Sequence, residues 1–189
     1  MADGHLDARV SPRFARVWDP LVRIFHWSLV TSILIAWLSP GIFGDVHEAA
    51  GFAALGLICL RIVWGLFGSR YARFSQFLRP PKAIIAYLRD IRDARESRYL
   101  GHNPAGGAMI VALLLMTIAT ASSGWMMVTD TFFGIVWVEV LHKLTSHLLM
   151  LMVVAHLVGV LLASWRHHEN LVRAMITGRK RPAADVDVA

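Results

Sequence analysis

Charged side chains are scarce in this chain. Asp, Glu, Lys and Arg make up 17% of the 189 residues, whereas hydrophobic residues make up 56%. Soluble domains carry about 25% charged and about 45–50% apolar residues, so this composition disfavours a water-soluble enzyme and excludes a collagen-like or disordered chain. The one cysteine, Cys59, excludes an internal disulfide, a CxxC motif and the CxxCH motif of covalently attached haem. Composition therefore favours a multi-span membrane protein.

Four apolar stretches are long enough to cross a bilayer, which requires about 20 residues of helix. They cover residues 24–43, 47–68, 104–129 and 144–165. We therefore predict an all-α fold, an integral membrane four-helix bundle that forms one domain over residues 1–189. The polar ends, 1–15 and 182–189, are expected to be flexible.

The long connection between the second and third spans contains a further predicted helix. Within residues 80–98, Ile84, Leu88 and Ile91 fall on one face among Arg and Asp residues. This pattern is typical of an amphipathic helix that lies on a membrane surface. We expect it to anchor the connection to the inner surface, and docking of a cytoplasmic partner is the alternative.

Positive charge is distributed very unevenly along the chain, which has a net charge of +6. Of the 19 Lys and Arg residues, only Lys143 lies in a connection on the opposite side from the others. Basic residues mark the cytoplasmic side of a membrane protein. We therefore predict that both termini and the long connection are cytoplasmic, in a bacterial inner membrane. Topology accounts for the charge, so no nucleic-acid partner is expected, only membrane lipid.

The nine histidines are the candidate functional residues, because ionisable side chains inside a bilayer are costly. A hydrogen-bonded imidazole between helices is the alternative for any single one. His142 and His156 are two heptads apart and share a helix face, about 21 Å apart along the axis. His147 points away from both. Depth in the membrane pairs His47 with His142 at the outer side and His26 with His156 at the inner side.

Two histidine pairs stacked in a four-helix bundle are suited to two haem groups. A closed zinc site would need about four ligands, whereas each level offers two. We therefore predict two non-covalent haem groups whose axial ligands are His26 and His156 (inner), and His47 and His142 (outer). Arg61 is near the inner level, where it either pairs with a haem propionate or extends to the interface.

Small residues on the spans have two interpretations that stay open. They give a flat macrocycle room to approach the backbone, or they allow close helix packing. The glycines concerned are Gly51, Gly56, Gly124 and Gly159. His102, which precedes the third span, either caps that helix or borders a quinone pocket.

The sequence around these histidines resembles the bacterial cytochrome b561 / nickel-iron hydrogenase b-type cytochrome family. The matching segments are DPLVRIFHW, HEAAGFAALGLICLRIVWG, GHNPAGGAM, LHK, AHLVG and WRHHENLVRAMITGRKR. The resemblance covers about residues 16–181 and implies four helices that hold two b haems. The family's ligand positions match His26, His47, His142 and His156.

The resemblance also implies electron exchange between an outer-face redox partner and membrane quinone. A dehydrogenase, a hydrogenase or a c-type cytochrome would be such a partner, and a homodimer is left open. The outer connections contain Asp45, Glu48, Asp130 and Glu139, an acidic rim that suits a basic cytochrome c. A stand-alone superoxide:ubiquinone oxidoreductase is the alternative. A haem-free, His-lined metal transporter or scaffold ranks below both.

Overall fold

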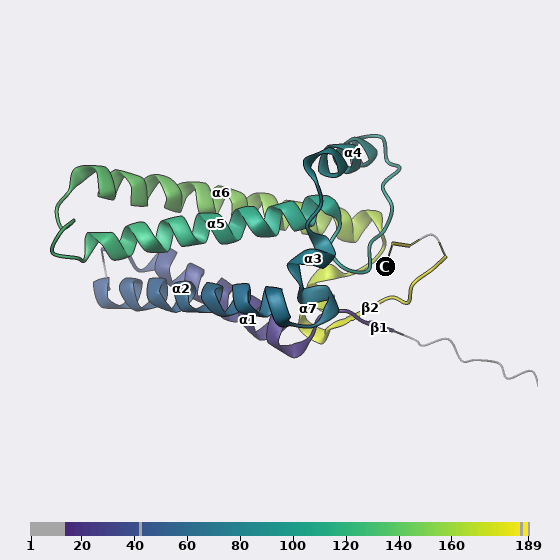
Figure 1. Cartoon of the computed structure of the whole chain (residues 1–189), viewed down its shortest axis with the longest axis horizontal. Helices are drawn as coiled ribbons and strands as arrows, with labels where there is room; N and C mark the ends of the chain where they lie inside the picture. The colour runs from purple at the N-terminus through teal and green to yellow at the C-terminus, as the bar shows by residue number, and fades with distance from the viewer. Residues whose placement is uncertain (1–13, 42, 186, 189) are drawn as a thin grey trace, which may run out of the picture.

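The computed structural model describes residues 14–41, 43–185 and 187–188. Most of the segment 1–15, which was expected to be flexible, lies outside the described residues, as does His5. Four long helices run side by side and form most of the molecule (Figure 1). They are α1 (Pro20–Leu38), α2 (Gly44–Phe67), α5 (Pro104–Met127) and α6 (Val136–Arg166). All four are long and apolar enough to cross a membrane. The protein is an all-α membrane four-helix bundle.

Helix α1 begins and ends earlier than the predicted span 24–43 because local signals set both ends. The Asp19 side chain accepts a hydrogen bond from the Val22 amide at 2.9 Å, and Pro20 occupies the first turn. Its last residue is Leu38, and Gly41 then turns the chain with a φ of 77°. The outer connection between α1 and α2 is consequently very short.

The bundle has an apolar exterior, and its buried helix positions include many small or polar residues beside larger ones such as Ile58 and Val138. Large hydrophobic side chains face outward, such as Leu34 (52% exposed) and Leu151 (65% exposed). Buried positions on the helices include Ala50, Ala54, Thr117, Ser123 and Thr145. Small residues and Ser or Thr let helices approach closely inside a membrane, where burial of apolar surface gives no advantage. The surface therefore matches a lipid environment.

The long connection forms one turn of 3₁₀ helix, η1 (Arg70–Ala72), and two short helices, α3 (Phe74–Phe77) and α4 (Pro81–Arg92). Helix α4 packs against α5 with Tyr87 buried. Leu88, which was expected on the face towards the membrane surface, is 50% exposed, while the neighbouring Tyr87 is buried. The helix thus presents Ile85 and Leu88 outward.

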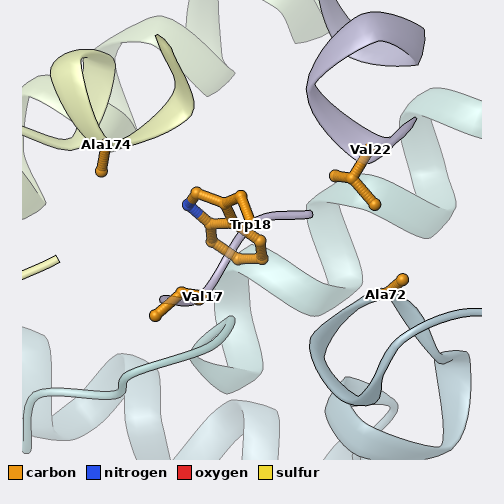
Figure 2. Close-up of a cluster of buried hydrophobic side chains, with 5 residues drawn as sticks. All are labelled: Val17, Trp18, Val22, Ala72 and Ala174. Atoms are coloured by element: carbon orange, nitrogen blue, oxygen red, sulfur yellow. The ribbon is translucent and has the colours of Figure 1, made fainter. Parts of the chain in front are cut away.

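Both chain ends and the long connection meet at one end of the bundle (Figure 1). Strand β1 (Ala15–Arg16) pairs antiparallel with β2 (Arg179–Lys180), which follows the short helix α7 (Leu171–Thr177). Trp18 lies at the centre of a buried cluster with Val17, Val22, Ala72 and Ala174 (Figure 2). We call residues 14–19, 69–103, 167–185 and 187–188 the cap.

A buried ionic network holds the cap together. Arg98 from the long connection pairs with Glu169 at 2.7 Å and also with Asp187, and Lys180 lies 3.3 Å from Glu169. All four side chains are at most 6% exposed. The tail 182–189 was expected to be flexible, yet the Val188 amide donates to the Arg98 carbonyl. Asp187 and Val188 are therefore part of the packed cap.

Candidate functional site

His47 and His142 lie opposite one another between α2 and α6. Their ring centroids are 6.0 Å apart and the rings are nearly perpendicular, at 87°. Metal–imidazole bonds are about 2 Å long, and the ring centre lies about 1 Å behind the nitrogen, so two rings that share one metal ion have centroids about 6 Å apart. The spacing of this outer pair therefore suits a shared metal ion.

The other nitrogen of each outer ring is held by the protein backbone. His47 Nδ1 is 2.7 Å from the Ala36 carbonyl, and His142 Nδ1 is 3.0 Å from the Thr120 carbonyl. Because a carbonyl only accepts, both Nδ1 atoms carry the proton and donate it. Each Nε2 keeps its lone pair for a metal, which is the usual arrangement for a ligating histidine.

A glycine on α5 makes room for the outer pair. A Cβ added at Gly124 would lie 3.0 Å from His142 Cε1 and 3.2 Å from its Nδ1. Glycine at this position therefore leaves room for the His142 imidazole ring. Gly51, one turn after His47, has no heavy atom within 4 Å of an added Cβ, so open space lies beside the ligand pair. Gly56 and Gly159 are exposed on the bundle surface.

The inner pair joins α1 to α6. His26 and His156 are close enough to interact electrostatically. His26 Nδ1 is buried and has no hydrogen-bond partner among the described residues. The ring of His26 contacts Trp27 edge-on, with centroids 5.1 Å apart. The rings of His47 and His142 thus lie close together, whereas His26 on α1 and His156 on α6 are within electrostatic range of one another.

Two further polar residues lie at the inner level. Arg61 Nη2 donates to the Ala72 carbonyl at 3.1 Å, and its guanidinium lies over the Phe74 ring, 5.2 Å from the centroid. The His102 ring contacts Trp18 at a tilt and Phe77 edge-on, with ring centroids 4.5 and 4.9 Å apart. It does not cap α5, because the cap is the Asn103 side chain, which accepts from the Gly106 amide at 2.7 Å.

Electrostatics keep His102 neutral. Burial, followed by the positive charges of Arg61 and Lys180, lowers its pKa from 6.5 to about 3. The imidazole is thus an uncharged hydrogen-bonding group at neutral pH. His147 differs, because its Nδ1 bonds the Lys143 carbonyl of its own helix at 2.7 Å and its side chain is exposed.

Sequence reasoning missed the groups that support these histidines. The acceptors at Ala36 and Thr120 are backbone carbonyls, which every residue has, so the sequence cannot indicate them. Ser123, whose Oγ lies 3.3 Å from His142 Nδ1, follows Thr120 in a polar run within an otherwise apolar span, and that run was a usable signal. Within the described part of the chain, no three His, Cys, Asp or Glu side chains converge on a metal-sized site.

A membrane-spanning helical bundle that brings imidazoles together in pairs belongs to the class of membrane proteins built to hold haem between helices. The comparison with protein families then identifies the particular group: the model of prokaryotic cytochrome b561 matches residues 17–178. The chain belongs to this family. It is a membrane b-type cytochrome that binds haem b and takes part in electron transfer. Searches of curated proteins and of solved structures find no match.

Proposed function

We propose that this chain binds two haem b groups and relays electrons across the membrane between an outer-face redox partner and the quinone pool. His47 and His142 would hold the outer haem, and His26 and His156 the inner haem. The observation that carries the proposal is the outer pair, in which the ring centroids of His47 and His142 lie 6.0 Å apart. His26 and His156, which are within electrostatic range of one another, are the candidates for the second pair. A haem bound between two imidazoles supplies one-electron exchange and leaves no open position for oxygen.

The protein's own groups fix the ligands before any haem arrives. The carbonyls of Ala36 and Thr120 orient the rings of His47 and His142 and raise the basicity of each Nε2. Gly124 leaves the His142 ring its place against α5. Preorganised ligands of this kind reduce the cost of ordering side chains when a cofactor binds.

We infer that the cap is cytoplasmic and that the membrane is the bacterial inner membrane. The long connection and both described chain ends lie together at the cap end, while the α1–α2 and α5–α6 connections lie at the other (Figure 1). The basic residues follow the same division, which supports this orientation. The inner pair would then face the cytoplasmic leaflet, where we place quinone exchange.

A separate protein would meet the outer haem. The outer connections are short, since α1 ends at Leu38 and α5 at Met127, so they contain no redox domain. Asp45, Glu48 and Asp130 are exposed at this end, and Glu139 is half-buried. An acidic rim favours association with a basic cytochrome c or a similarly charged dehydrogenase or hydrogenase subunit.

Single histidine variants test the ligand assignment. A reduced-minus-oxidised spectrum of the purified native protein should show b-type bands. His26→Ala and His156→Ala should each remove the same haem, and His47→Ala and His142→Ala should each remove the other. His147→Ala is the matched control and should keep both. Loss of different haems in His26→Ala and His156→Ala would contradict the pairing.

Two alternative functions can be tested by separate measurements. A stand-alone superoxide:ubiquinone oxidoreductase is disfavoured because the exposed acidic rim repels an anion. Rapid quinone reduction by superoxide with purified protein alone would overturn that preference. A haem-free metal transporter or scaffold is disfavoured because the histidines meet as pairs, whereas zinc prefers about four ligands. Absence of b-type bands from the purified protein would favour it.

A further inference from the structure

Two side-chain nitrogen atoms at the cap end of the bundle are buried without a hydrogen-bond partner. Arg61 Nη1 is a donor, and His102 Nδ1 is a donor in one of the two tautomers of the neutral ring. Arg61 Nη1 and His102 Nδ1 have essentially no solvent-accessible area and no acceptor among the described residues. A buried donor without a partner costs about 1–3 kcal/mol, and more when the group is charged. Each such group in a folded protein calls for an explanation, such as an ion or ligand that satisfies it.

The surrounding aromatic rings fix these two groups in place. The His102 ring contacts Trp18 and Phe77, and Phe77 contacts Phe74, over which the Arg61 guanidinium lies. The backbone of α5 packs closely on this cluster, because a Cβ at Gly107 would lie 2.6 Å from the Phe77 carbonyl oxygen. The donors therefore have little freedom to turn towards a partner elsewhere.

The charge at this place is also unbalanced. The positive charges of Arg61 and Lys180 both raise the electrostatic potential at His102. Lys180 is paired with Glu169 within the cap, but Arg61 is not within ion-pair distance of any described carboxylate. A buried guanidinium is normally paired, since an isolated buried charge is strongly unfavourable. The Asp19 carboxylate acts on Arg61 electrostatically, but it accepts from Trp64 and Ser69 and forms no ion pair with the guanidinium. Arg61 Nη1 is therefore left for a further negatively charged acceptor.

We propose that Arg61 and His102 together receive a carboxylate of the inner haem, so that His102 is a positioning residue for that haem. This inference rests on the proposed function, because it needs a haem between His26 and His156. Both inner ligands contribute to the electrostatic environment of His102, so the donors lie near the place where that haem would bind. A haem propionate supplies the missing charge and the missing acceptors together.

The reduction potentials of the two haems test this proposal. The protein is purified in lipid nanodiscs without quinone, and the inner haem is identified as the one lost in His156→Ala. His102→Leu should shift the equilibrium between the oxidised and reduced inner haem about tenfold towards the oxidised form. This corresponds to a reduction potential lower by about 59 mV for one electron. The reason is that a propionate with fewer hydrogen-bond donors keeps more of its negative charge, which stabilises ferric iron relative to ferrous iron. Arg61→Gln should shift the equilibrium in the same direction, and the outer haem should not change.

Matched variants show whether His102 acts through a hydrogen bond or only through packing. His102→Gln keeps an N–H donor and should restore most of the native potential, or retain the inner haem if His102→Leu loses it. His147→Leu, on the exposed face of α6, should leave both potentials unchanged. If the Leu and Gln variants both lose the inner haem, or shift its potential equally, the residue acts by packing and the proposal is wrong.

The remaining outcomes distinguish a failure of this proposal from a failure of the proposed function on which it rests. A native protein without an inner haem would refute the proposed function itself. Two haems in the native protein with unchanged potentials in His102→Leu would refute this inference alone. If that variant instead raised only the KM for added ubiquinone, the two donors would serve a quinone carbonyl, which would also overturn the proposal.

Discussion

Glu169→Gln removes one negative charge from the buried network of the cap while keeping the size of the side chain. The Glu169 carboxylate accepts from Arg98 Nη2 at 2.7 Å and from the Arg181 amide at 2.8 Å, and it lies 3.3 Å from Lys180 Nζ. The variant leaves Arg98 and Lys180 with Asp187 as their remaining acidic partner within the described network. Two buried cations would then share one carboxylate.

The expected cost follows from burial. Side chains of Arg98 and Glu169 are only 5% and 6% exposed, so water does not replace the lost interaction. Removing one partner of a buried ion pair costs about 3–5 kcal/mol. Asp93→Asn is the matched control, because Asp93 pairs with Arg92 and Arg95, which are 76% and 72% exposed. Exposed pairs contribute about 0–1 kcal/mol.

Hydrogen exchange measures the effect locally. The Val17 amide donates to the Gly178 carbonyl at 3.0 Å, so its exchange reports opening of the β1–β2 end of the cap. We expect a large loss of protection at Val17 in Glu169→Gln and almost none in Asp93→Asn. Equal protection in the two variants would refute the reasoning.

The same network predicts loosening of the cap in acid. Burial raises the pKa of Glu169, but hydrogen bonding to Arg98 and the charge of Lys180 outweigh it, so the pKa lies below the ordinary 4.5. A carboxyl whose pKa is lowered by folding stabilises the fold above its unfolded value, and that contribution is lost as the pH falls through the folded value. Val17 protection should therefore be constant from neutral pH to about 5 and fall below 4.5.

Three other variants or fusions probe separate parts of the account. Gly124→Ala places a Cβ 3.0 Å from His142 Cε1 and should lower outer-haem occupancy, measured by the optical spectrum, whereas Gly44→Ala, with open space around it, should not. Asp19→Ala removes the α1 cap, worth about 0.5–2 kcal/mol, and also the acceptor of Ser69 and Trp64. It should therefore lower the free energy of unfolding by at least that amount, whereas Asp45→Ala at an exposed position should have a smaller effect. A C-terminal fluorescent-protein fusion should fluoresce in cells, and activity of a periplasmic reporter at that position would contradict the orientation.

The long helices could be predicted from sequence because lipid imposes a simple rule on their composition. Their ends were less predictable: Asp19 and Pro20 start α1 before the apolar run begins, and α6 starts at Val136, ahead of the predicted span 144–165. That His47 and His142 lie close together could be predicted, because depth and helical phase are both fixed by chain position.

The cap could not be predicted in the same way. Arg98 and Asp187 are 89 residues apart, and their charges look like the other charges of the cytoplasmic segments until folding brings them together. The pairing of Ala15 with Lys180 involves two residues per strand, too short to leave a periodic pattern. The aromatic cluster around His102 likewise depends on three segments that only meet in the folded chain.

The amount of haem per chain tests the central claim most directly. Purified native protein, assayed for haem b against protein concentration, should contain two haems per chain, and a redox titration should resolve two one-electron steps. His142→Ala should contain one haem and a single step. A native ratio of one haem or none, with the protein folded, would contradict the assignment of the two histidine pairs.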